Sequence, residues 1–175
     1  MKKLILTILA TFMLVITVGC ANNDLVKVKV DAFFFEGASE EEIVAEAKEL
    51  GLSFYTINAD GSVTYEIEKQ HYDEILANYK TNLQVIIDEF TDGEEKIPSF
   101  NHIEVSDNLD KFTIIVNDYY TGMDSMMAMP FMVLGAYYQN FMGLSLKNID
   151  VVIEFVHYDT KEVLDSLSFK ELFNE

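Results

Sequence analysis

The side chains best suited to binding a ligand are methionines that gather in one stretch of the chain. Apart from Met1 and Met13, every methionine lies between Met123 and Met142. Thioether sulfur is a soft ligand that suits Cu(I), and flexible methionines also line adaptable apolar binding surfaces. The candidate residues for a ligand or Cu(I) site are Met123, Met126, Met127, Met129 and Met132.

The residue pattern leaves several interpretations of this stretch open. We expect a deformable core helix that Pro130 breaks or restarts, so that Met126→Glu and Met127→Glu would bury an unpartnered carboxyl group and destabilise the fold severely. The alternatives are a groove for an apolar ligand or partner and a Cu(I) site, although no His or Cys lies in residues 123–142 to strengthen the latter. Residues 126–146 also have the length and lack of charge of a membrane span.

Candidates for catalysis are few. His71, His102 and His157 are the only side chains with an ordinary pKa near neutrality, and the chain lacks GxSxG, HExxH, P-loop and GxGxxG sequences. His71 and Glu74 have a chelating i, i+3 spacing, but we interpret the histidines as surface residues at the ends of elements. The sequence predicts no catalytic residues, no enzymatic activity, no cofactor and no dedicated metal site.

An acidic turn at residues 88–95 invites a calcium interpretation. An EF-hand loop needs oxygen ligands at positions 1, 3 and 5 and a Glu at position 12. Counted from Asp88, position 3 is Phe90 and position 12 is Ser99. The spacing fails, and a solvated helix end is the expected structure.

The N-terminus has the pattern of an export signal. Lys2 and Lys3 precede the uncharged apolar run from Leu4 to Val18, which is short for a membrane span but typical of a signal-peptide core. Residues 17–20 resemble a bacterial lipobox. We therefore predict a lipoprotein signal peptide over 1–19, diacylation of Cys20 and a short tether over 20–24, which place the protein at the outer face of the cell membrane.

Composition excludes some classes of function. The 175 residues carry a formal charge of −18, and all 12 basic residues are Lys. Because nucleic-acid binding depends on clustered basic residues, a nucleic-acid partner is not expected. One Cys rules out an internal disulfide. A hydrophobic fraction of 50% is ample for a packed core.

Hydrophobic periodicity places the elements that must position these residues. We expect a strand over 26–30, a helix that starts at a Ser39–Glu42 capping box and stops at Gly51, and a hairpin around the Asn58–Gly61 turn. A long helix should run over 69–91. Its predicted apolar stripe consists of Tyr72, Leu76, Tyr79, Leu83, Ile86 and Phe90.

The rest of the chain continues the alternation of hairpins and helices. A second hairpin is predicted over 103–116, a broken helical segment over 118–143 and a third hairpin over 149–169. Hairpins pair antiparallel. The predicted fold is therefore one α+β domain over 25–175, with an antiparallel sheet of about seven strands and about three helices on one face.

Several segments resemble a family of small uncharacterised lipoproteins of low-GC Gram-positive bacteria, some of which carry a label taken from antigen I/II adhesins. The resemblance rests on residues 31–37, 58–65, 98–100, 137–143 and 159–163. It implies an exported lipoprotein and carries over no activity. We thus expect a non-catalytic binding or structural surface protein, held to the membrane by its lipid, with a protein, peptide or cell-wall ligand. The alternative is a Cu(I)-handling or small apolar ligand-binding protein that uses residues 123–142.

Overall fold

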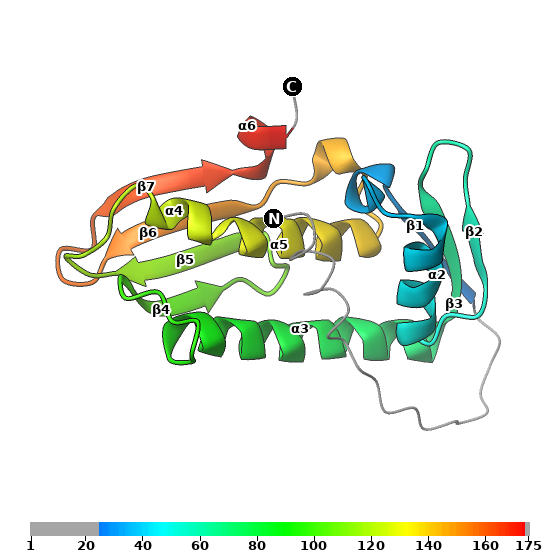
Figure 1. Ribbon diagram of the computed structural model, residues 1–175, viewed down its shortest axis with the longest axis horizontal. Helices are drawn as coiled ribbons and strands as arrows, with labels where there is room; N and C mark the ends of the chain where they lie inside the picture. Colours follow the sequence, from blue (N-terminus) through cyan, green and yellow to red (C-terminus); the bar gives the residue numbers. More distant parts are fainter. Residues whose placement is uncertain (1–24, 174–175) are drawn as a thin grey trace. The chain divides into compact units, whose positions relative to one another are not determined.

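The computed structural model describes residues 25–173 and divides the chain into two compact units (Figure 1), one ending at Asn82 and one beginning at Leu83. The α+β class is confirmed. The prediction of a single antiparallel sheet is wrong, because the strands form one sheet of three and one of four. That residues 25–175 behave as one domain stays a prediction. The signal peptide, Cys20 and the tether lie outside the described residues.

The first unit is built on a three-stranded antiparallel sheet. Its elements are β1 (Leu25–Val30), the 3₁₀ helix η1 (Ala32–Phe35), α2 (Glu40–Glu49), β2 (Tyr55–Ile57) and β3 (Val63–Glu68). The strand order is β1-β3-β2. Because side chains alternate along a strand, one face collects the buried residues, which are Val28, Val30, Val63, Tyr65 and Ile67.

Local signals set the limits of α2, as the sequence predicts. The Ser39 N–H donates to the Glu42 carboxylate at 2.8 Å, and the Glu42 N–H donates to Ser39 Oγ at 3.3 Å, which is the reciprocal pattern of a capping box. The chain leaves the helix through Gly51, whose φ of 69° favours glycine.

Helix α3 (Lys69–Thr91) has the predicted limits, and the boundary between the units falls within it. Its buried stripe is slightly rotated from the predicted one. The predicted Tyr79, Leu83 and Phe90 are buried, as are Ile75 and Ile87. The other predicted members, Tyr72, Leu76 and Ile86, flank this stripe and are half-buried.

The second unit has a four-stranded mixed sheet with the order β4-β5-β6-β7. The strands are β4 (Phe100–Val105), β5 (Lys111–Val116), β6 (Val152–His157) and β7 (Val163–Ser168). The two predicted hairpins are present as β4–β5 and β6–β7. However, β5 and β6 pair in parallel, because the chain between them crosses over through helices instead of turning back.

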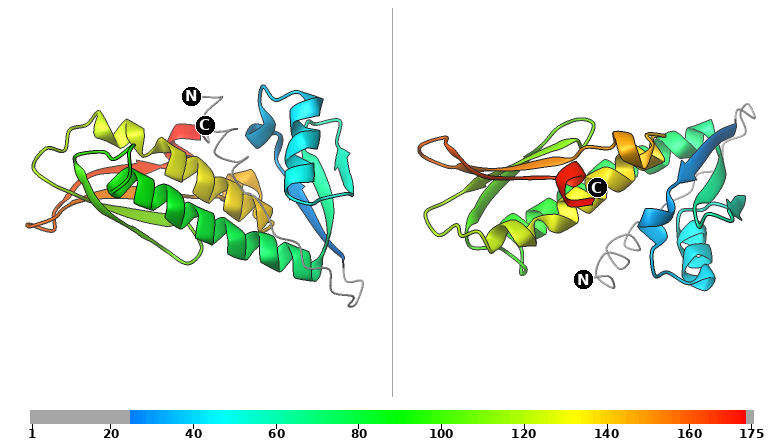
Figure 2. Two further views of the ribbon diagram at one scale, coloured as in Figure 1. Left: turned by 60° about the horizontal axis from the view of Figure 1, so that its bottom comes forward. Right: turned by 90° about the horizontal axis from the view of Figure 1, so that it is seen from above.

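Helix α5 (Met129–Phe141) packs on one face of this sheet (Figure 2). The Phe131 ring lies 5.7 Å from that of Phe112 on β5 and 5.1 Å from that of Phe90 on α3. Gly135 permits the close approach, since a Cβ there would lie 2.5 Å from the Leu109 carbonyl oxygen. The 3₁₀ helix η2 (Leu146–Asn148) then leads to β6, and the short α6 (Phe169–Phe173) follows β7.

Candidate functional site

The methionine segment separates into exposed and buried side chains. Met123, Met126 and Met127 are 78%, 63% and 52% exposed, whereas Met132 is 0% exposed. Met129 is intermediate. The expectation of a core segment is therefore correct for Met132 and wrong for the first three. The physical reason is that their neighbours Ser125 and Ala128 occupy the inward-facing positions of this turn.

Helix α4 (Asp124–Met127) places the three exposed methionines together. Met123 precedes it with helical dihedral angles, φ −74° and ψ −29°, so Met126 and Met127 follow it at the i+3 and i+4 positions of one face. Ser125 and Ala128 occupy the opposite side and are 6% and 0% exposed. We call Met123, Met126 and Met127 the methionine face.

Hydrogen bonds within the turn hold the backbone of this face. The Thr121 N–H donates to Asp124 Oδ2 at 2.8 Å, and the Asp124 N–H donates to the Thr121 carbonyl oxygen at 2.9 Å. Ser125 Oγ donates to the Gly122 carbonyl oxygen at 2.7 Å. The methionines are thus exposed on an ordered turn, whose inward side is packed.

The loop before α4 is fixed to the sheet. The Asn117 side-chain amide donates to the Pro98 carbonyl oxygen at 2.9 Å and to Asn101 Oδ1 at 2.9 Å. The Tyr120 ring stacks on Phe155 with centroids 5.1 Å apart, and its hydroxyl donates to Asp165 Oδ2 at 3.2 Å. Burial, followed by the Asp165 carboxylate, raises the pKa of Tyr120, so its hydroxyl remains a neutral donor.

A third attachment joins the loop to the last hairpin. His157 Nε2 lies 2.9 Å from Asp118 Oδ1. Its Nδ1 accepts from the backbone N–H groups of Asp159 and Thr160 at 3.4 Å and 3.2 Å. Because Nδ1 accepts, the proton resides on Nε2 and is donated to Asp118. Both ring nitrogens of His157 therefore help to hold the loop against the last hairpin.

The other two histidines lie on α3 and β4. His71 Nε2 is 2.8 Å from the carbonyl oxygen of Leu50, the residue that ends α2. Its Nδ1 is 3.8 Å from Glu74 Oε2, so the i, i+3 spacing gives a contact between two side chains of one helix. His102 is exposed on β4.

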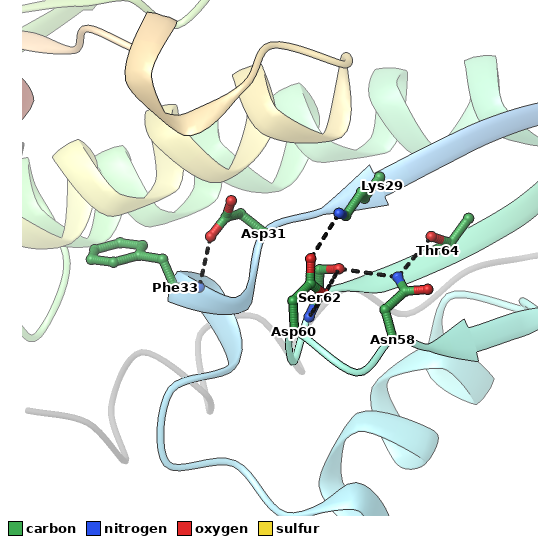
Figure 3. A network of polar contacts seen from close by, with 7 residues as sticks. All are labelled: Lys29, Asp31, Phe33, Asn58, Asp60, Ser62 and Thr64. Atoms are coloured by element: carbon green, nitrogen blue, oxygen red, sulfur yellow. Dashed lines mark hydrogen bonds and ion pairs between the residues drawn. The ribbon is translucent and has the colours of Figure 1, made fainter.

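A polar network surrounds the first hairpin turn (Figure 3). Asp60 Oδ1 accepts from the Ser62 N–H at 3.1 Å, and Asp60 Oδ2 accepts from Lys29 Nζ at 3.0 Å. The Asn58 amide donates to Ser62 Oγ and Thr64 Oγ1, each at 3.0 Å. Hydrogen bonds from Ser62, followed by that from Lys29, hold the pKa of Asp60 well below its usual value. These groups bind one another and thereby fix the turn.

Two further predictions concern metals and membranes. The acidic turn is a helix end, as expected, where Glu89 Oε1 accepts from the Glu94 and Glu95 N–H groups at 2.7 Å and 3.1 Å. Within residues 25–173, no three His, Cys, Asp or Glu side chains gather to hold a metal ion. None of the helices in that range combines the length and apolar character needed to cross a membrane.

One sequence signal points to the methionine face and was missed. Thr121 and Asp124 have an i, i+3 spacing at which a Thr backbone N–H and an acidic side chain can close a turn, which favours a break in the helical segment before Pro130. Such a turn would have placed Met126 and Met127 on a different element from Met132.

The chain was also compared with known proteins. No protein-family model, curated protein sequence or solved structure matches it. The family resemblance of the sequence therefore stays a prediction, and the candidate site rests on the residues alone.

Proposed function

We propose that this protein is an exported, lipid-anchored protein that acts by binding, and that the methionine face is its binding site. The observation that carries the proposal is the 78%, 63% and 52% exposure of three neighbouring methionines on a hydrogen-bonded turn. Large apolar side chains that gather at a protein surface mark sites of interaction, and methionine is well suited to such sites because it adapts its shape to the ligand.

The construction of the turn supports this assignment. An exposed apolar side chain at a frayed chain end needs no explanation, but the turn that leads into α4 is closed by hydrogen bonds between Thr121 and Asp124. The loop before that turn is held by Asn117 and Tyr120. Because the backbone beneath the methionine face is already held, a ligand does not have to order it, and this lowers the entropic cost of binding.

The membrane anchor is part of the proposal. Cleavage before Cys20 and diacylation of its sulfur would hold the chain firmly, since two acyl chains suffice for stable anchoring. The chain from Cys20 to Leu25 can extend at most ~18 Å, so β1 would begin close to the bilayer. The full sequence has a formal charge of −18, and cleavage before Cys20 would also remove Lys2 and Lys3, so the anchored protein would be repelled by an anionic leaflet. The protein would thus present its binding site outside the cell.

Site-specific photo-crosslinking in intact cells tests this function. A photoreactive amino acid is placed at position 126 of the full-length protein, and a matched control is placed at position 85 of α3. Met126 and Val85 are both 63% exposed, so random encounters label both positions equally. We expect a discrete adduct from position 126 that the control does not give, and expect Met127→Glu to abolish that adduct.

Equal, diffuse labelling from both positions would contradict a macromolecular ligand at this face. Release of the protein into the medium without loss of the adduct would contradict only the role of the anchor.

A further inference from the structure

We infer that the methionine face is a binding site for a soft monovalent metal ion, Cu(I) or Ag(I), with the sulfur atoms of Met123, Met126 and Met127 as ligands. This inference rests on the proposed binding role of the face and adds a metal ion to the macromolecular partner that the crosslinking experiment tests. It differs from the sequence-based candidate set, because Met132 is fully buried and Met129 lies outside the exposed face.

Helix geometry brings the three sulfur atoms within reach of one ion. Residues at i, i+3 and i+4 have β-carbons roughly 5–6 Å apart, and each methionine has three rotatable bonds with which to direct its sulfur. Their side chains are 78%, 63% and 52% exposed. An ion can therefore enter from solvent without any opening of the fold.

The chemistry of the ligands determines the metal. Thioether sulfur is neutral and soft, and it selects Cu(I) over ions such as Ca²⁺ and Mg²⁺ that prefer oxygen. The carboxylate closest in sequence, that of Asp124, is held by the backbone and hydroxyl of Thr121. Three neutral sulfur ligands would also leave the charge of a divalent ion uncompensated.

The surrounding charge favours a cation. The Asp118 side chain, in the loop that leads to α4, is 77% exposed, and the protein as a whole carries a formal charge of −18. A negative field raises the local concentration of cations and their rate of association. Because a thioether has no proton to exchange in the physiological range, affinity should not depend on pH as it does for imidazole ligands.

Competition with a chromogenic Cu(I) chelator under reducing conditions tests the inference on the full-length protein in detergent micelles. The informative variant combines Met123→Leu, Met126→Leu and Met127→Leu, which preserve side-chain volume and remove the sulfurs. The matched control is Met142→Leu, since Met142 is 40% exposed but lies beyond α5. Cys20→Ala is introduced into all three proteins, so that no thiolate competes with the thioethers for Cu(I).

We expect the parent and the Met142→Leu control to bind one Cu(I) with equal affinity, and the triple variant to bind at least about tenfold more weakly. The far-UV circular dichroism of the three proteins should coincide, which separates ligand loss from unfolding. Ag(I) should bind the parent equally well at pH 5.5 and pH 7.5. Equal binding by parent and triple variant, or no binding by the parent, would overturn the inference.

A Cu(I) affinity that changes with pH as His or carboxylate groups are protonated would also overturn the inference. The result is separable from the crosslinking experiment. A discrete adduct from position 126 without metal binding would leave the binding function standing and eliminate only the metal as its ligand.

Discussion

Truncation of two methionines six residues apart should have very different effects on stability. Met132 is a residue of α5 and is 0% exposed, so Met132→Ala removes a fully buried side chain and leaves a cavity. That change costs about 2–5 kcal/mol. Met126 is 63% exposed, so only about a third of its surface leaves water on folding. With about 1.5–3 kcal/mol for complete burial of such a side chain, Met126→Ala should cost about 0.5–1 kcal/mol.

Urea unfolding followed by far-UV circular dichroism measures both free energies of unfolding. The two residues lie in the same unit, so they report on the same structure and the comparison does not depend on whether the two units unfold together. Met142→Ala, at a site 40% exposed, is the control for truncation of a surface methionine. Equal costs at positions 126 and 132, or a cost above about 2 kcal/mol at position 126, would refute the assignment of Met126 to the surface.

Three further predictions follow from other parts of the chain. Cys20→Ala should release the protein from the membrane or leave it unprocessed in a fractionation assay, and membrane partitioning like that of the parent would contradict lipid anchoring. In chemical denaturation, Leu83→Ala should lower the free energy of unfolding by about 2–5 kcal/mol because Leu83 is 3% exposed. Val85→Ala, at a site 63% exposed on the same helix, should lower it by less than about 1 kcal/mol. The reverse order would mean that α3 buries its other face. The Asp60 carboxylate has a lowered pKa in the folded state, so its contribution to folding stability is present above the usual pKa of 3.8 and is lost as pH falls through the folded-state pKa. The difference in stability between the parent and Asp60→Asn should therefore shrink on acidification. A difference that grows would contradict the network.

Local signals in the sequence predict the local elements well. The capping box at Ser39 and Glu42 forms the expected hydrogen bonds, and all three predicted hairpins are present. These elements depend on residues close together in the chain, so short-range patterns determine them. The limits of α3 are predicted for the same reason, since its start and end are set by the flanking residues.

The arrangement of the strands depends on information that the pattern lacks. Alternation in β5 and β6 reports that one face of each strand is buried but not which strand lies beside it. Their parallel pairing, and the separation of β1–β3 into another sheet, are set by how the connecting segments cross over. A row of hairpins therefore suggests one antiparallel sheet where two sheets form.

The sequence pattern also does not determine which methionines of the candidate site are exposed. Met126 and Met132 are chemically identical, and a segment rich in apolar residues has too little contrast to reveal which side faces inward. The exposure of Met126 follows from the burial of its small neighbours Ser125 and Ala128 and from the hydrogen-bonded turn before α4, which separates α4 from α5. In the sequence, only the spacing of Thr121 and Asp124 indicates that turn.

The most direct test of the methionine face is the methionine-methyl ¹³C NMR spectrum of the full-length protein during titration with Ag(I). Each methyl resonance is assigned by a single Met→Leu change, which makes every methionine its own reporter. We predict that the resonances of Met123, Met126 and Met127 shift together and saturate at one equivalent, while those of Met132 and Met142 stay in place. Shifts at Met142 of the same size, or no shift at the three exposed methionines, would contradict the methionine face as a binding site for such an ion.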